Sequence, residues 1–102
     1  MIMIYIDDEY LSEEFQNYLE NFDPQVAPIS EFIAEVEEAW NHDYGALHTQ
    51  ELENCYEVVF ITGGWSDNED IINHIMMNEK LLQVLVYEQW NRGGKFIFRI
   101  YK

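Results

Sequence analysis

Glutamates between residues 31 and 38 have a spacing that suits recognition of a cationic surface. Glu31, Glu35 and Glu38 are placed at i, i+4 and i+7, and Glu37 lies beside them. On a helix this spacing presents carboxylates along one face about every 5–6 Å of axis. Phosphates along one nucleic-acid strand are about 6–7 Å apart in space, although they advance only about 3.4 Å along the axis. The pattern therefore indicates either a decoy for a nucleic-acid-binding groove or a solvated helix face that maintains solubility.

The charge of the whole chain is strongly segregated. The net charge is −15, from 20 acidic and five basic residues in 102. Residues 1–79 contain 19 of the acids and no Lys or Arg, whereas residues 80–102 contain all five bases and one acid, Glu88. Such a field repels nucleic acid and anionic membranes and attracts basic surfaces. We therefore expect a basic protein partner, neither nucleic acid nor a membrane. The residues expected to bind it are Glu9, Glu13, Glu14, Glu20, Glu31, Glu35, Glu37 and Glu38.

A glycine-rich segment, Thr-Gly-Gly-Trp-Ser at 62–66, is the second candidate site. It lies between a predicted strand and a predicted helix, where backbone N–H groups can bind an anion. A possible ligand loop therefore consists of Gly63, Gly64, Trp65, Ser66 and Arg92. The segment lacks the lysine of a P-loop and the G-x-G-x-x-G spacing. In the alternative interpretation the glycines permit a turn, the tryptophan packs and the serine caps the next helix.

Catalytic and metal-binding patterns are weaker. His42 and His48 could approach one another beside Asp43, but no recognised metal-ligand spacing occurs. Cys55 is the only cysteine, so it cannot form an intramolecular disulfide, and it begins a predicted buried strand, where thiols are inert. We predict no catalytic residue, no metal site and no cofactor, and we do not expect an enzyme.

The elements that position these residues follow from periodicity. We predict one α+β domain, 1–102, with the order β-α-α-β-α-β-β and a C-terminal hairpin. It comprises an acidic helical region, 7–54, and a strand–GGWS–helix–hairpin module, 55–102. The predicted strands are 2–6, 55–62, 82–90 and 95–101, and the predicted helices are 7–22, 30–40 and 66–78. Residues 46–54 are weakly patterned and suggest at most a helical turn.

Three apolar stripes define the predicted core and its helices. The first helix has Leu11, Phe15, Leu19 and Phe22 on one face; the second has Phe32, Ile33, Val36 and Trp40; the third has Ile71, Ile72, Ile75 and Met76. We expect Asp7 or Asp8 to cap the first helix, Ser30 to open the second, and the glycines of 91–94 to form the hairpin loop.

No secretory signal or membrane span is evident, because the apolar start runs directly into acidic residues and no apolar run approaches about 18 residues. We therefore expect a location in the cytoplasm of a bacterial host cell. A homodimer through Trp65, Trp90 and Tyr101 is a further possibility.

Residues 62–100 resemble a family of small acidic proteins from bacteriophages and mobile elements of Gram-positive bacteria. The likeness is carried by a TGGWS-x-NE segment and a later W-x-RGG-x-F-x-F-x-I segment. The matching positions are Thr62, Gly63, Gly64, Trp65, Ser66, Asn68, Glu69, Trp90, Arg92, Gly93, Gly94, Phe96, Phe98 and Ile100. Lys95 departs from the pattern, in which a histidine follows the glycines.

The resemblance implies a phage origin and no particular activity. By analogy, small acidic phage proteins include inhibitors of host defence, among them anti-CRISPR proteins that imitate DNA. We therefore expect an acidic inhibitor of a basic, nucleic-acid-handling host defence protein, acting as a DNA mimic. The alternative is a phage accessory protein that binds a small molecule or nucleotide through the GGWS loop and Arg92.

Overall fold

A four-stranded antiparallel sheet forms one layer of the molecule. The computed structural model describes residues 4–7, 10–64, 66–91 and 94–102, with the side chains of Asp7 and residues 87–91 excepted. The strand order is β3-β4-β6-β5, with bounds Ala46–Glu51, Cys55–Ile61, Lys95–Tyr101 and Leu85–Asn91 respectively. The central pair, β4 and β6, aligns Val58 with Phe98 and Phe60 with Phe96. The sheet therefore consists of two hairpins, β3–β4 and β5–β6, which meet where β4 pairs with β6.

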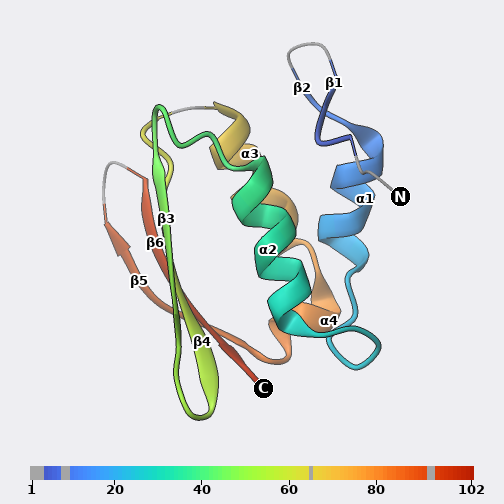
Figure 1. Cartoon of the computed structure of the whole chain (residues 1–102), viewed down its shortest axis with the longest axis vertical. Coiled ribbons are helices and arrows are strands. Elements are labelled where there is room, and N and C mark those ends of the chain that lie inside the picture. The colour runs from blue at the N-terminus through green and yellow to red at the C-terminus, as the bar shows by residue number, and fades with distance from the viewer. Residues whose placement is uncertain (1–3, 8–9, 65, 92–93) are drawn as a thin grey trace.

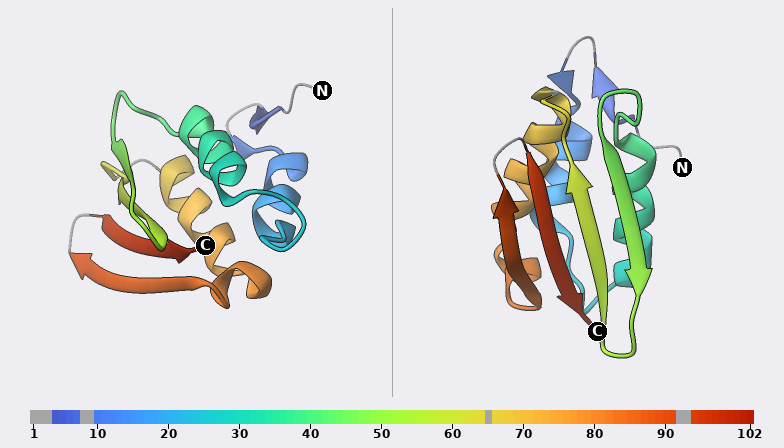
Figure 2. Two further views of the ribbon diagram at one scale, coloured as in Figure 1. Left: turned by 60° about the horizontal axis from the view of Figure 1, so that its bottom comes forward. Right: turned by 90° about the vertical axis from the view of Figure 1, so that its left-hand side faces the viewer.

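The helices all lie on one side of this sheet (Figures 1 and 2). They are α1 (Glu13–Asn21), α2 (Ile29–Ala39), α3 (Ser66–Met76) and the short α4 (Glu79–Leu82). In both figures α2 and α3 lie nearest the sheet, and α1 packs on their far side. A small hairpin of β1 (Ile6–Asp7) and β2 (Tyr10–Leu11) leads into α1. The single α+β domain with the order β-α-α-β-α-β-β is thus confirmed.

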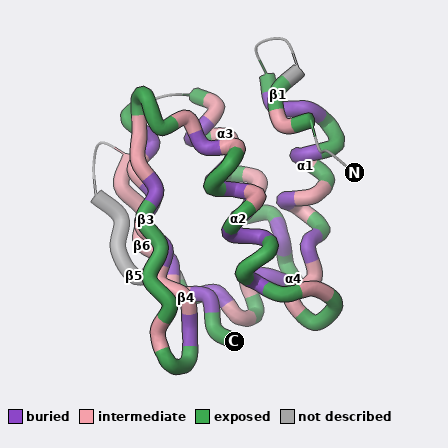
Figure 3. Tube along the Cα trace, viewed as in Figure 1, coloured by how far each residue is buried: buried purple, intermediate pink, exposed green. Residues whose placement is uncertain are grey.

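The core lies between the sheet and the helices. Alternate strand residues point inward, so Val58, Phe60, Phe98 and Ile100 are buried. The predicted apolar stripes of the helices meet them, and Phe15, Leu19, Phe32 and Ile71 are at most 1% exposed. In Figure 3 the buried residues, in purple, occur both in the strands of the sheet and in the helices that cover it. One predicted member, Met76, is instead 40% exposed because it lies in the last turn of α3.

The N-terminal boundaries differ from the sequence prediction. The apolar start predicts a strand of the main sheet, but the described part of it, β1, pairs only with β2. The first helix begins at Glu13 instead of beside Asp7 or Asp8, because Ser12 is its N-cap and accepts a hydrogen bond from the N–H of Phe15 at 3.1 Å. The second begins at Ile29, directly after Pro28, one residue before the predicted start.

Two further elements were not predicted. Residues 46–51 form β3, not a helical turn, because they pair with β4 along their whole length. Residues 79–82 form α4, whose N-cap Asn78 accepts from the N–H of Leu81, so the next strand begins at Leu85 and not at Leu82. Asn78 also donates to the carbonyl groups of Leu19 and Phe22, both at 2.9 Å, and so joins α4 to the end of α1.

Candidate functional site

The carboxylate row, defined as Glu31, Glu35 and Glu38 of α2, lies on the side of this helix that meets two tyrosines. The hydroxyl of Tyr5 donates to Glu35 Oε2 at 2.5 Å. Tyr18, on α1, packs its ring 5.8 Å from that of Phe32 on α2. The row therefore borders the contact between α1 and α2, with aromatic rings beside its carboxylates.

The pKa values of Tyr5 and Tyr18 are raised by burial and by the neighbouring glutamates. Burial, together with the charges of Glu31 and Glu35, raises the pKa of Tyr18 to about 12. Burial also raises the pKa of Tyr5, with additional contributions from its hydrogen bond to Glu35 and from the charges of Glu35 and Glu38. Both phenols therefore stay neutral at pH values where an ordinary tyrosine begins to ionise.

The eight predicted partner-binding glutamates have different surroundings. Those exposed and without an ion-pair partner among the described residues are Glu13, Glu14, Glu31, Glu37 and Glu38. Glu20 is partly buried and contacts His74 Nδ1 at 2.6 Å, and Glu35 is held by Tyr5. Glu9 lies outside the described residues. The structure thus leaves α2 as the helix with the larger number of exposed, unpaired carboxylates.

The charges at the end of α2 oppose helix stability. Its last turn contains Glu37 and Glu38 and no basic residue. The C-terminal end of a helix carries the negative pole of its dipole, so acids there are unfavourable by a few tenths of a kcal/mol each. By contrast, Glu13 and Glu14 occupy the first turn of α1, where the dipole favours them. Fold stability accounts for the acids of α1 and not for those at the end of α2.

Gly63, in the predicted ligand loop, and Gly94 are enclosed by contacts within the protein. Gly63 has φ +65°, and a Cβ there would lie 1.5 Å from the carbonyl oxygen of Tyr44. Gly94 has φ +84°, and a Cβ there would lie 2.0 Å from Thr62 Oγ1. The N–H of Thr62 donates to the carbonyl of Gly94 at 2.9 Å. The two glycine-containing turns therefore pack on each other and on the 41–45 loop.

Asn68 joins two of these segments, the 41–45 loop and the turn after β4, to α3. It is fully buried, accepts from the N–H of Asn41 at 2.9 Å, and donates to the carbonyls of Asn41 and Thr62 at 3.1 and 3.2 Å. Ser66 is the first residue of α3, and Gly64 faces open space. Trp65 and Arg92 lie outside the described residues. Gly63 thus has a structural role, and no contact of the described loop residues indicates a ligand.

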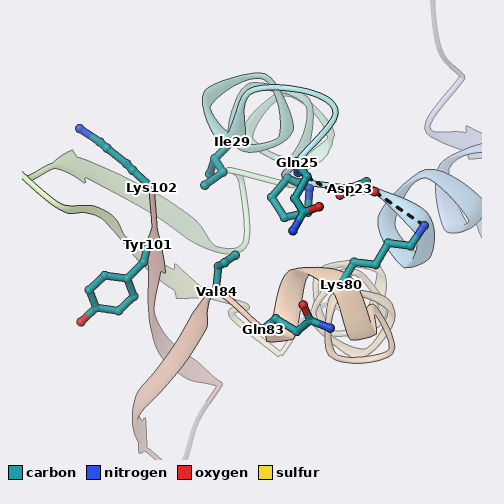
Figure 4. Close-up of a pocket in the computed structure, with 9 residues that line it drawn as sticks. Asp23, Gln25, Ile29, Lys80, Gln83, Val84, Tyr101 and Lys102 are labelled. Atoms are coloured by element: carbon teal, nitrogen blue, oxygen red, sulfur yellow. Dashed lines mark hydrogen bonds and ion pairs between the residues drawn. The ribbon is translucent and has the colours of Figure 1, made fainter.

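A shallow pocket of about 330 Å³ lies at the other end of the sheet, between the start of α2 and the α4–β5 connection (Figure 4). Its charged groups are already paired, since Lys80 Nζ is 3.9 Å from Asp23 and Lys102 Nζ is 2.9 Å from Glu51. Figure 4 shows Lys102 and Tyr101 pointing away from the other lining residues. Polar groups do not converge on one point here, as they do in ligand sites.

The histidines are dispersed. The ring of His42 contacts the carbonyl of Glu37 at 2.9 Å, His74 contacts Glu20, and His48 is exposed on β3. Among the described residues there is no group of three potential metal ligands. The thiol of Cys55 is buried. Within the same residues no helix is both long and apolar enough to cross a membrane.

The fold and site define an α+β protein with an antiparallel sheet, helices on one face and an acidic row on one of those helices. Comparison with protein-family models, with curated proteins and with solved structures found no match.

Proposed function

We propose that this protein is a non-enzymatic, phage-type inhibitor that presents the acidic face of α2 to the basic, nucleic-acid-binding surface of a host defence protein in the bacterial cytoplasm. The carboxylates stand in for phosphates, so the partner's own nucleic acid competes for the same surface. Among defence proteins, analogy favours a CRISPR effector.

The observation that carries this proposal is the placement of exposed, unpaired glutamates at the end of α2. Glu37 and Glu38 lie where the helix dipole disfavours them, and no described cation offsets them. A surface that served solubility alone would intersperse both signs of charge at no cost in helix stability. A local cost without a structural return is typical of residues retained for binding.

The neighbouring tyrosines support the same conclusion. Tyr5 and Tyr18 border the row, and neutral aromatic rings next to carboxylates suit guanidinium and ammonium groups through cation–π contact. The field of the 19 acids in residues 1–79 would accelerate the approach of such a partner.

The test compares two variants that remove the same charge. One replaces Glu37 and Glu38, both exposed on α2, by Gln; the control replaces Glu69 and Glu79, exposed on two other helices, by Gln. Each protein is immobilised and exposed to a nuclease-treated bacterial lysate, and the captured proteins are identified by mass spectrometry.

We expect the unmodified protein and the control to capture a basic nucleic-acid-binding protein that added duplex DNA displaces, and the α2 variant to lose it. Equal capture by the two variants, or capture unaffected by DNA, would contradict the proposal.

A further inference from the structure

The free edge of β3 lacks the features that normally prevent another strand from pairing with it. β3 lies at the end of the sheet and pairs with β4 in six consecutive positions without a bulge. Its sequence, Ala-Leu-His-Thr-Gln-Glu, contains no proline and no lysine. The opposite edge strand, β5, does have a register shift between Tyr87 and Gln89. Bulges, prolines and lysines are among the usual protections of an edge strand; β3 has none of these three, and its one acidic residue, Glu51, is at its end.

The hydrogen-bond pattern shows which backbone groups face outward. The N–H of Leu52 donates to the carbonyl of Cys55 at 2.8 Å, which makes these two residues a hydrogen-bonded pair of the hairpin. Pairs alternate along an antiparallel ladder, so Gln50 and His48 also direct their backbone groups toward β4. The N–H and C=O groups of Leu47, Thr49 and Glu51 consequently point away from the sheet.

This edge is accessible. His48, Thr49, Gln50 and Glu51 are all exposed, although they alternate between the two faces of the sheet. Figures 1 and 3 show why, since the β3–β4 hairpin extends beyond the helices at its lower end. No described segment pairs with the outer side of β3.

The negative charge of the segments beside β3 favours a cationic strand as the one that pairs with this edge. The right-hand view of Figure 2 shows α2 running behind and beside β3. The segments that border the edge belong to residues 1–79, which contain no Lys or Arg, and they expose Glu37, Asp43 and Glu53. Lys102, a described cation beside this edge, is hydrogen-bonded to Glu51 and thereby holds the pKa of that carboxyl below its usual value. A second copy of this chain would bring the same acids to the same edge, so like-charge repulsion disfavours it.

We propose that an extended, lysine- or arginine-bearing segment of the protein partner adds to the sheet as a fifth strand along β3. This inference rests on the proposed function, because it takes the basic partner from there. Backbone hydrogen bonds to Leu47, Thr49 and Glu51 supply affinity, and alternate cationic side chains meet the exposed acids of the segments that border the edge, Glu37, Asp43 and Glu53. The partner is thus held by main-chain pairing in addition to charge.

The experiment uses the full chain and a defined probe, an acetylated and amidated peptide of about nine alternating threonines and lysines, longer than β3. Amide hydrogen exchange is followed by NMR with and without the peptide at low salt. We expect exchange of the Leu47, Thr49 and Glu51 amides to slow by at least about tenfold. The amides of His48 and Gln50, which already face β4, should change much less. Peptide binding without this alternating pattern would overturn the inference.

A variant pair gives a second measurement. Thr49→Pro removes an outward N–H and breaks no bond to β4, whereas Thr49→Val retains that N–H; edge strands tolerate proline at such positions. We expect Thr49→Pro to weaken the peptide by at least about tenfold relative to Thr49→Val, and thermal unfolding checks that both are folded. Equal affinities would overturn the inference, and the exchange pattern of the unmodified protein decides the matter if Thr49→Pro does not fold.

The outcomes separate this inference from the function on which it rests. Salt-sensitive peptide binding that the α2 variant weakens, without slowed exchange along β3, would refute strand addition and leave the acidic surface intact. Binding that the α2 variant and its control affect equally would count against the acidic face itself. Sedimentation of the protein alone as a dimer that Thr49→Pro dissociates would give the edge to a second copy and would also overturn the inference.

Discussion

Replacing Asn68 by alanine is expected to lower the free energy of unfolding by more than a replacement at an exposed position of the same helix, α3. The side chain makes three hydrogen bonds, to the backbone N–H and C=O of Asn41 and to the C=O of Thr62. Each buried hydrogen bond contributes about 1 kcal/mol net, so the free energy of unfolding should fall by about 3 kcal/mol. At this chain length the melting temperature should fall by about 12 °C or more.

Two comparisons make the Asn68 prediction sharp. Asn68→Asp retains the oxygen that accepts from Asn41 but places its other oxygen beside two carbonyl groups, so it should cost at least as much as alanine. The control, Asn73→Ala, changes an exposed residue of α3 and should alter stability by only a few tenths of a kcal/mol. Urea unfolding followed by circular dichroism measures all three. If Asn68→Ala lies within about 0.5 kcal/mol of Asn73→Ala, the structural explanation of the TGGWS-x-NE segment fails.

Further predictions concern the turns, the acidic helix and the tyrosines. Gly94→Ala should lower the free energy of unfolding by several kcal/mol, because the new Cβ would meet Thr62 Oγ1. Adding Thr62→Ala should restore part of that loss. Gly64→Ala, at φ +75° in open space, should lower the free energy of unfolding by only about 1–2 kcal/mol in the same urea assay. Replacing Glu37 and Glu38 together by Gln should leave stability unchanged or raise it by up to about 1 kcal/mol, and a clear loss would refute the dipole argument. Because the pKa of Tyr18 is raised to about 12 in the folded protein, the unfolded chain releases this proton at a lower pH than the folded chain does. The contribution of Tyr18 to the free energy of unfolding is therefore complete below about pH 10 and is lost as the pH rises toward about 12. Between these limits Tyr18→Phe should lose less stability than the unmodified protein, and equal losses would contradict this.

The parts of the fold that sequence predicts well are those with a strong local pattern. The spacing of Leu11, Phe15 and Leu19 predicts one buried helix face, and all three are buried. The glycines before Lys95 predict the turn between the last two strands, and β5 and β6 are paired there. In these segments the local pattern and the tertiary packing favour the same conformation.

The unpredicted elements depend on contacts between distant segments. β3 has one buried side chain, Leu47, so it lacks the alternation that would reveal a strand, and only its pairing with β4 defines it. The N-terminal apolar run predicts an edge or central strand, yet its described part pairs locally with β2. Asn78 gives a local signal for α4, because asparagine is a favoured N-cap, but its bonds to the end of α1 span more than fifty residues.

The candidate site divides in the same way. Helical spacing predicts that Glu31, Glu35 and Glu38 share a face of α2. Their neighbours, Tyr5 and Tyr18, come from segments more than ten residues earlier, and no spacing rule connects them to α2. The pairing of Glu20 with His74 spans 54 residues and removes one predicted acid from the freely exposed set. Charge composition therefore predicts that the protein has an acidic surface, whereas the tertiary structure is needed to say which residues form it.

The most direct test of the central claim is the affinity of this protein for the basic protein it captures, measured at about 50 and 500 mM NaCl. We predict that affinity falls by at least about tenfold across this range, because the contact consists largely of exposed carboxylates facing cations. We also predict that the variant with Glu37 and Glu38 replaced by Gln binds more weakly at low salt than the variant with Glu69 and Glu79 replaced by Gln. An affinity that does not change with salt, together with equal binding by the two variants, would contradict the account.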